Sequence, residues 1–221
     1  MHNTAPVIAR RNMIRQQIRP WDVLDPNILD IFDTVPRERF VPPAHKALAY
    51  SDTQIPLDHD QVMMEPRLEG RLLQALQPGP QDSVLEIGTG SGYVTACMAR
   101  LAASVHSVDI FESFTRAAQD KLKHIGVDNV TLETADAGRG LGDGKQRFEV
   151  IAVTGSLPEL HQGFHHRLVI GGRMFVIVGR FPVMEALLIT RTGEDAWATE
   201  SLFDTLVPPL LNAEPPPRFE F

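Results

Sequence analysis

Residues 83–93 read Ser-Val-Leu-Glu-Ile-Gly-Thr-Gly-Ser-Gly-Tyr, and this stretch decides the fold. The apolar run 84–87, with a β-branched residue at each end, predicts a buried strand. Three glycines at alternate positions follow, and then Val94, Met98 and Leu101 recur at helical spacing. A strand, a glycine turn and a helix in this order open a nucleotide-binding βαβ unit, because glycine permits positive φ and lets a ligand lie against the main chain.

The residues around the glycines indicate which nucleotide is bound. Asp109 ends the next apolar run, about 20 residues after Gly88, where a carboxylate can accept hydrogen bonds from the ribose of NAD, FAD or S-adenosylmethionine. The glycine spacing is G-x-G-x-G, which differs from the G-x-G-x-x-G of dinucleotide sites. Glu86 lies just before Gly88, and its carboxylate would repel a pyrophosphate but suit an ammonium and a sulfonium. The pattern favours S-adenosylmethionine, and the alternative is that Glu86 only pairs locally.

The composition is that of one large globular unit. The chain has 221 residues, of which 43% are hydrophobic and 22% are charged, so it can bury a sizeable core. Its net charge of −7 lacks the basic field that non-specific nucleic-acid binding needs, and we expect no nucleic-acid partner. We find no secretory signal and no apolar run long enough to span a membrane, which predicts a cytoplasmic protein.

Strands and helices alternate along most of the chain. The expected strands are 84–87, 105–108, 129–134, 148–153, 174–178, 186–191 and 198–206. The expected helices are 6–18, 27–34 with Asp25 as its N-cap, a short helix ending at 48, 68–76, 94–101, 112–125 and 157–168. This order predicts an α/β fold: a Rossmann-like, doubly wound, mostly parallel seven-stranded sheet with an N-terminal helical extension. We expect a helical cap with a substrate loop in 1–78, a nucleotide-binding domain in 79–207 and a proline-rich, extended tail in 208–221.

A long irregular segment precedes the first strand of the sheet. Residues 50–66 contain several turn signals and are a candidate lid over a substrate or cofactor. The alternative is a surface connection held down by Val62 and Met63.

The histidines do not predict a metal centre. They have no zinc-like spacing with cysteines or acids, and an adjacent pair would point to different faces of a helix. We assign structural or solvated roles, and no metal, to His59, His106, His161, His165 and His166.

Several stretches resemble the class I S-adenosylmethionine-dependent methyltransferases and, more narrowly, the protein-L-isoaspartate O-methyltransferase family. The resemblance rests on 37–42, 48–52, 84–93, 148–151 and 168–174, together with Asp109 and Asp136, and it covers most of the chain. It implies transfer of a methyl group from S-adenosylmethionine to a carboxyl group of a damaged protein or peptide, with S-adenosylhomocysteine as product.

The same resemblance implies a set of cofactor-binding residues. The set is Glu86, Gly88, Thr89, Gly90, Gly92, Asp109, Ile110, Asp136 and Ala137. The backbone around the glycines would hold the methionine part, and Asp109 would hold the ribose. Asp136 and Ala137 would meet the adenine, where the family has an Asp-Gly pair. The alternative role for Asp136 is that of a turn residue at a strand end.

The substrate loop departs from the family pattern. The family reads Gly-Gln-Thr-Ile-Ser, a variable residue and Pro, whereas residues 60–66 read Asp-Gln-Val-Met-Met-Glu-Pro. The expected loop residues are Gln61, Val62, Met63, Met64 and Glu65. Val62 replaces the threonine, and Met64 replaces the serine that the family uses as its active-site residue. A hydroxyl can orient an incoming carboxylate, which methionine cannot do, and Glu65 would repel an isoaspartyl carboxylate.

Three functions therefore stay open at this point. The first is isoaspartyl methylation, the second is methylation of a different acceptor that suits the less polar loop, and the third is non-catalytic binding of S-adenosylmethionine.

Overall fold

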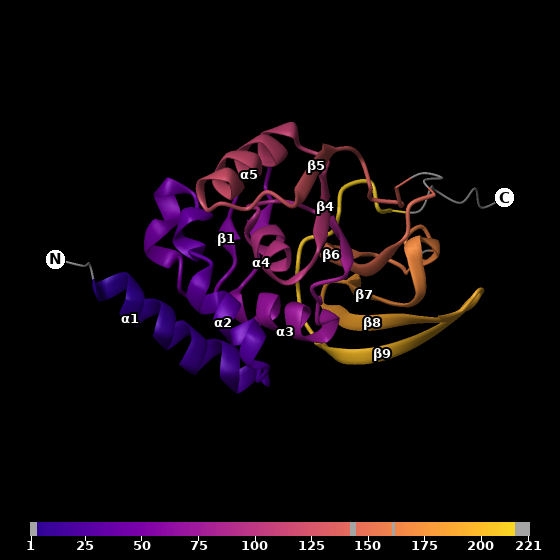
Figure 1. Cartoon of the computed structure of the whole chain (residues 1–221), viewed down its shortest axis with the longest axis horizontal. Helices are drawn as coiled ribbons and strands as arrows, with labels where there is room; N and C mark the ends of the chain where they lie inside the picture. The colour runs from indigo at the N-terminus through magenta and orange to yellow at the C-terminus, as the bar shows by residue number, and fades with distance from the viewer. Residues whose placement is uncertain (1–3, 142–144, 161, 215–221) are drawn as a thin grey trace.

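The computed structural model describes residues 4–141, 145–160 and 162–214, and a single large sheet runs through it (Figure 1). Its seven strands lie in the order β5-β4-β3-β6-β7-β8-β9. The strands are β3 (Ser83–Ile87), β4 (Ser104–Asp109), β5 (Val130–Thr134), β6 (Phe148–Leu157), β7 (Leu168–Arg180), β8 (Val183–Gly193) and β9 (Ala196–Asp204). The strands from β5 to β7 in that order pair in parallel, and β8 and β9 are antiparallel. The mostly parallel, seven-stranded sheet predicted from the sequence is confirmed.

The strand order creates a crevice beside β3. Ile87, the last residue of β3, pairs with Val108 of β4 on one side and with Val153 of β6 on the other. The chain leaves β3 toward β4 and later returns to the opposite side as β6. Ligands of open α/β sheets bind at such a switch point, outside the carboxyl ends of the strands.

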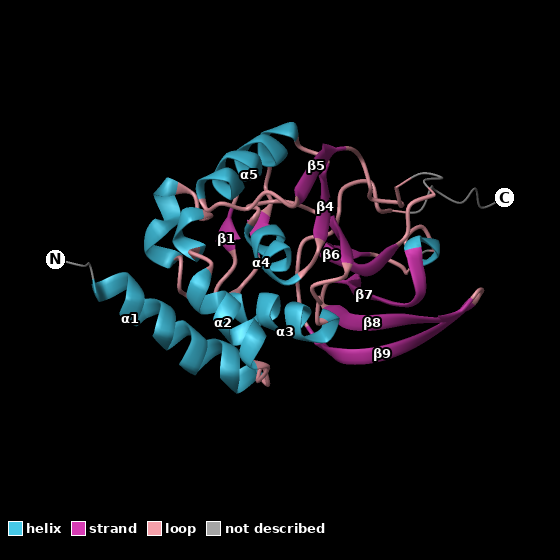
Figure 2. Ribbon diagram, in the orientation of Figure 1, coloured by secondary structure: helices cyan, strands magenta, loops and turns pink. Residues whose placement is uncertain are grey.

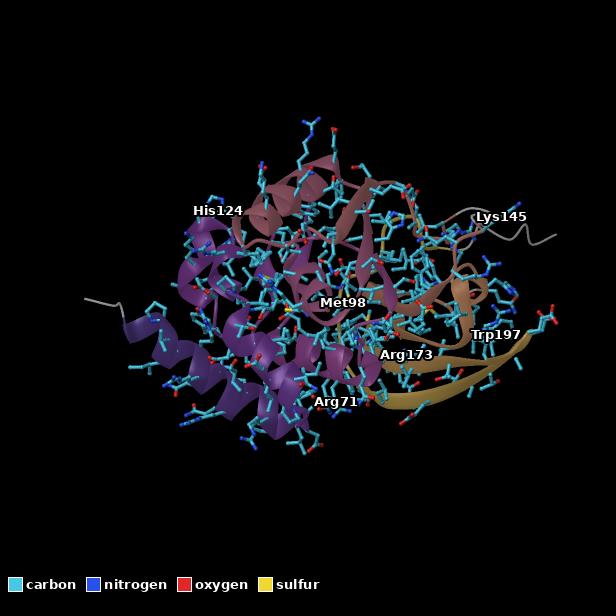
Figure 3. All side chains as sticks on the ribbon, in the orientation of Figure 1. Arg71, Met98, His124, Lys145, Arg173 and Trp197 are labelled. Carbon is cyan, nitrogen blue, oxygen red and sulfur yellow. The ribbon has the colours of Figure 1, made fainter. Side chains whose placement is uncertain are left out.

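One face of the sheet is covered by helices, as Figure 2 shows. These include α3 (Pro66–Leu76), α4 (Tyr93–Leu101) and α5 (Glu112–His124). Helix α3 buries leucines at helical spacing, and α4 is buried over nearly its whole length. Figure 3 shows side chains, among them Met98, filling the space between these helices and the sheet.

The N-terminal extension is helical, as the sequence predicts. Helix α1 (Thr4–Met13) continues into a π-helical turn (Ile14–Ile18) and a 3₁₀ turn (Arg19–Trp21). Helix α2 (Pro26–Thr34) begins at the predicted cap, because the Asp25 carboxylate accepts from the backbone N–H of the second helical residue at 2.8 Å. Two further 3₁₀ turns follow at Arg37–Arg39 and Pro43–Leu48.

The segment expected to be irregular contains a small hairpin. Strands β1 (Ile55–Pro56) and β2 (Val62–Met63) pair antiparallel within it. At the tip of the hairpin, His59 and Asp60 both have left-handed φ values, 58° and 56°. The family pattern has glycine at position 60, so Asp60 keeps a backbone shape that glycine adopts most easily.

The opposite face of the sheet carries a second core, and here one prediction was wrong. The expected helix 157–168 is absent from the described residues: β6 continues to Leu157, and only His165–Arg167 form a 3₁₀ turn. Phe164 and Leu168 reach the second core from this connection, so tertiary packing outweighs the local helical pattern. His165 and His166 pack edge-on against Trp197, and His161 lies outside the described residues.

Three sheet strands exceed their predicted bounds by four or more residues. Strand β6 runs four residues past its expected end at Val153, β7 spans 168–180 where 174–178 was expected, and β8 spans 183–193 where 186–191 was expected. The sequence also predicts a glycine-rich turn through residue 144, and residues 142–144 lie outside the described residues. Within the described part of the chain, no helix combines the length and the apolar character that crossing a bilayer requires.

Candidate functional site

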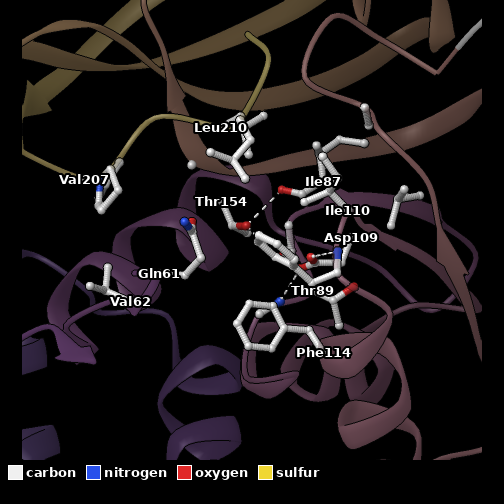
Figure 4. A pocket seen from close by; sticks show the side chains of 18 of the residues that line it. Gln61, Val62, Ile87, Thr89, Asp109, Ile110, Phe114, Thr154, Val207 and Leu210 are labelled. Carbon is white, nitrogen blue, oxygen red and sulfur yellow. Dashed lines mark hydrogen bonds between the residues drawn. The ribbon is translucent and has the colours of Figure 1, made fainter. Parts of the chain in front are cut away.

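The candidate site is a pocket at the switch point, shown in Figure 4. Its walls surround about 900 Å³ of space, counted with the open mouth. The walls come from the ends of β3, β4 and β6, the residues after β5, the β1–β2 hairpin and residues 207–211. In Figure 4 the Gln61 side chain lies on one side of this space and Asp109 on the other.

The glycine turn forms the floor of the pocket. Gly88 and Gly90 line it, with left-handed φ values of 101° and 48°. A Cβ on Gly88 would lie 2.3 Å from the hydroxyl of Thr154, which donates to the carbonyl oxygens of Ile87 and Gly88. No other residue fits at Gly88 without displacing Thr154. The sequence analysis did not single out Thr154, although it follows directly after a predicted strand.

Gly92 lies at the start of α4. It does not line the pocket, and a Cβ there would lie 2.9 Å from the Cβ of Ala118 in α5. With φ at 83°, Gly92 forms the N-cap of α4 and allows α5 to pack closely against it. Its absence of a side chain therefore serves packing between helices.

Glu86 also lies away from the pocket walls. Its side chain is fully buried, and one carboxyl oxygen accepts hydrogen bonds from the hydroxyls of Thr95 and Ser107. Burial raises the pKa of Glu86 to about 8, although these two hydroxyls lower it. The carboxyl is then mostly uncharged at neutral pH. The local pairing weighed as the alternative is present, and a contact between Glu86 and a cationic ligand stays a prediction.

Asp109 connects the glycine turn to the end of β4. Its two carboxylate oxygens accept from the backbone N–H groups of Gly90 at 2.8 Å and of Phe111 at 2.9 Å. Burial raises the pKa of Asp109, while these backbone donors lower it. Asp109 and Ile110 both line the pocket, as does Thr89. Each carboxylate oxygen keeps further acceptor capacity toward a ligand.

Asp136 and Ala137 line the pocket just beyond β5. One Asp136 oxygen accepts from the backbone N–H of Gly138 at 3.0 Å, which is the turn-forming contact expected as the alternative. The other oxygen accepts from the side chain of Asn212 at 2.7 Å. The two predicted ligand acids, Asp109 and Asp136, thus stand at the ends of neighbouring parallel strands in one pocket.

The predicted substrate loop supplies the opposite wall. Gln61, Val62, Met63 and Met64 line the pocket, so the positions of the missing hydroxyls face it with apolar side chains. Glu65 does not line the pocket. Its carboxylate oxygen Oε1 lies 3.6 Å from the guanidinium nitrogen Nη2 of Arg67.

The hairpin tip is clamped to the residues that follow Asp109. The His59 ring stacks on Phe111 with ring centres 3.9 Å apart, and its Nε2 lies 2.9 Å from the Ser113 hydroxyl. These contacts hold the tip of the hairpin against the residues that follow β4.

A buried ion pair behind the substrate loop was not predicted from the sequence. The Arg37 guanidinium is fully buried, pairs with Glu69, and donates to the carbonyl oxygens of Met64 at 2.7 Å and Ala49 at 2.9 Å. Glu69 also lines the pocket, and its burial raises its pKa while Arg37 lowers it. The sequence did contain an indication of this buried acid, because Glu69 occupies a position on the leucine-rich buried face of α3.

The contribution of the C-terminal tail to the pocket was not predicted from the sequence either. Residues 207–211 line the pocket, whereas we expected an extended tail without a site role. The backbone of Ser156 exchanges hydrogen bonds with Pro208 at 3.0 Å and Leu210 at 2.9 Å. A Cβ on Gly155 would lie 2.7 Å from the Leu210 side chain, so this glycine gives the tail room. We call residues 207–213 the strap. Residues 215–221 lie outside the described part of the chain.

The part of the chain that the structure describes contains no candidate metal site. No group of three or more His, Cys, Asp or Glu side chains in it is placed to hold a metal ion.

A parallel sheet with a glycine turn at its switch point, and acids after the next two strands, defines the Rossmann-like methyltransferase class. A family model for protein-L-isoaspartate(D-aspartate) O-methyltransferase matches residues 9–212. The protein-L-isoaspartate O-methyltransferase of Koribacter versatilis is 34% identical over 208 residues, 94% of this chain and 93% of that protein. The one of Roseiflexus castenholzii is 36% identical over 202 residues, 91% of each.

The fold agrees with this relationship. A Plasmodium falciparum protein described as a protein-L-isoaspartate O-methyltransferase, in complex with S-adenosyl-L-homocysteine, matches with a TM-score of 0.76. The match covers 92% of this chain and 97% of that one at 18% identity. This chain belongs to the protein-L-isoaspartate(D-aspartate) O-methyltransferase family, whose members use S-adenosylmethionine.

Proposed function

We propose that this chain transfers a methyl group from S-adenosylmethionine to a carboxyl group of a protein, with the isoaspartyl carboxyl of damaged proteins as the acceptor. The observation that carries the proposal is the pocket itself. Its floor is the half-buried backbone of Gly88 and Gly90, and the carboxylates of Asp109 and Asp136 border it. Family membership supplies the reaction class.

The residues present fit S-adenosylmethionine. The backbone at Gly88 and Gly90 is open to a ligand, since its conformation leaves no room for a side chain at Gly88. We assign the methionine part to this backbone, the ribose to Asp109 with Ile110 beside it, and the adenine to Asp136 and Ala137. We assign Glu86 and Gly92 supporting roles behind the floor.

Positioning is the main task of the chain in this reaction. The bound cofactor supplies a methyl carbon on a sulfonium, and its transfer leaves S-adenosylhomocysteine. A carboxylate is already ionised at neutral pH, so it needs no general base to attack that carbon. The lid formed by the β1–β2 hairpin and the strap excludes water and fixes the approach, which is where most of the rate enhancement of such a transfer arises.

The acceptor side favours a second candidate, a family member with a different methyl acceptor. Val62 and Met64 line the pocket without a hydroxyl, and Glu69 adds a carboxyl to the same wall. Arg37 does not offset this for a ligand, because its guanidinium is already engaged by Glu69 and two carbonyl oxygens. A non-catalytic S-adenosylmethionine binder is the third possibility.

A methyl-acceptor assay separates these candidates. The protein is incubated with radiolabelled S-adenosylmethionine and an isoaspartyl peptide, with the matching aspartyl peptide as control. Methyl ester that forms only on the isoaspartyl peptide supports the first function, and no product at saturating cofactor rejects it. Calorimetry with S-adenosylhomocysteine tests the pocket alone, and absence of binding would reject all three candidates.

The predicted division of the chain keeps a functional meaning in this proposal. We assign the acceptor side to residues 1–78 and the cofactor side to residues 79–207, and we add the strap to the cofactor side. The expected lack of a nucleic-acid partner and the cytoplasmic location stay predictions of the sequence.

A further inference from the structure

The far end of the strap reaches the acid that we assign to the adenine. The side-chain amide of Asn212 donates to one carboxylate oxygen of Asp136 at 2.7 Å. The other oxygen of Asp136 is held by the backbone N–H of Gly138 at 3.0 Å. Both oxygens are therefore fixed, one by a near neighbour and one by a residue 76 positions further along the chain. A carboxylate has about four acceptor positions, so two stay open to a ligand.

The contact is built into a close fit between two backbones. A Cβ on Gly138 would lie 2.1 Å from the carbonyl oxygen of Leu211 and 3.0 Å from the nitrogen of Ala213. Ala137 and Ala213 are both buried in the second core. Asn212 itself has a left-handed φ of 59°, which asparagine tolerates better than most residues. The amide thus points at Asp136 from a turn whose backbone packs against Gly138, while the side chains of Asn212 and Asp136 are exposed at the surface.

The residue that directly precedes the strap is also held. The side chain of Gln54 donates to the carbonyl oxygen of Leu206 at 2.7 Å, far from Asp136 in the chain. The chain therefore offers two separate ways to weaken the strap. One removes the contact to Asp136, and the other leaves that contact intact.

We propose that Asn212 is a positioning residue for cofactor recognition: it orients the Asp136 carboxylate so that its open acceptor positions face the exocyclic amine of the adenine. The inference rests on the proposed function and extends it to the choice of base. A base with an amine at this position donates to the carboxylate. A base with a carbonyl oxygen there, as in hypoxanthine, meets a second acceptor and is rejected. Without Asn212 the carboxylate is free to turn, and discrimination between the two bases weakens.

Calorimetry with two ligands tests this inference. The ligands are S-adenosyl-L-homocysteine and S-inosyl-L-homocysteine, which differ in the base alone. For the unchanged protein we expect a preference for the adenosyl ligand of about 100-fold, the size of a hydrogen bond to a charged group. In Asn212→Gly, which suits the left-handed backbone, we expect adenosyl affinity to fall about tenfold and inosyl affinity to change less than about threefold.

Gln54→Ala is the matched control. This substitution weakens the attachment of the strap and leaves the contact to Asp136 intact. The affinities for the adenosyl and the inosyl ligand should therefore fall by the same factor, and the ratio between them should not change. Asn212→Ala serves as a second variant and should show the same ratio of adenosyl to inosyl affinity as Asn212→Gly. Thermal unfolding of each variant is measured alongside.

One outcome overturns the inference alone: the ratio of adenosyl to inosyl affinity stays unchanged in both Asn212 variants, whether both affinities are kept or both fall by the same factor. If the unchanged protein binds neither ligand, the proposed function falls, and the inference falls with it.

Discussion

The glycine turn and the acceptor loop face each other across one pocket, but they depend on side chains in opposite ways. In the turn, the backbone forms the binding surface, and a single added carbon at Gly88 would collide with Thr154. In the loop, the side chains form the binding surface, because Val62 and Met64 line the pocket without a hydroxyl. At the hairpin tip, Asp60 holds the left-handed conformation that glycine adopts most easily. The donor side of the pocket is therefore sensitive to any added side chain, whereas the acceptor side is set by which side chains are present.

The largest expected effect lies in the turn. Gly88→Ala should lower the affinity for S-adenosylhomocysteine at least about 100-fold, because the methyl group collides with Thr154 at a φ of 101°. Calorimetry measures the affinity, and circular dichroism checks the fold. Gly171→Ala is the matched control: its φ is also positive, at 85°, but nothing lies within 4 Å of the added carbon. Equal affinities in both variants would contradict a backbone-defined donor site.

The next effect concerns the ion pair behind the loop. Arg37→Met leaves the Glu69 carboxylate buried without its partner and frees the carbonyl of Met64. We expect a loss of about 3–5 kcal/mol in the free energy of unfolding, measured by urea denaturation. Arg37→Met combined with Glu69→Met should recover most of it, since no charge is then left buried. If the double variant is as unstable as the single one, the pair does not act as a unit.

The third effect is a pH dependence on the donor side. The folded-state pKa of Glu86, about 8, lies above its ordinary value of 4.5. Folding therefore favours the protonated form, and this contribution is complete below about pH 4.5 and is lost as pH rises through 8. Denaturation between pH 5 and 8 should show falling stability, by at most about 1.4 kcal/mol per pH unit from this group. Glu86→Gln should flatten that slope, and an identical slope in the variant would refute the assignment.

The smallest effect restores the acceptor loop. Val62→Thr combined with Met64→Ser returns two hydroxyls to the pocket wall, where they can orient a carboxylate. We expect methylation of an isoaspartyl peptide to rise about fivefold, the equivalent of one ordinary hydrogen bond. Cofactor affinity should stay the same, which calorimetry checks on the same preparation. An unchanged methylation rate would mean that the loop side chains are not what limits the reaction.

The sequence predicted the parts of the molecule whose signals are local. The glycine turn, the seven strands, the cap at Asp25 and the pocket position of Asp109 follow from short patterns of apolar, glycine and acidic residues, whereas the pocket position of Asp136 was implied by the family resemblance. The altered loop could be located because Gln61 and its neighbours lie in a fixed motif.

What could not be predicted depends on contacts between distant segments. Glu86 has a local position that suggests a ligand contact, but its hydroxyl partners come from α4 and β4. The expected helix 157–168 gave way to a loop because its apolar residues complete a core formed by other strands. The strap was missed for the same reason: nothing in its composition shows that it lies on Ser156 and Asp136.

The strap sets an order on the assembly of the site. Residues 207–211 form a wall of the pocket, yet a ribosome makes them after every strand of the sheet. During synthesis, the sheet and the glycine turn can therefore exist before the binding cavity is closed. The nascent chain should gain cofactor affinity only after residues 207–211 have emerged and their backbone has paired with Ser156.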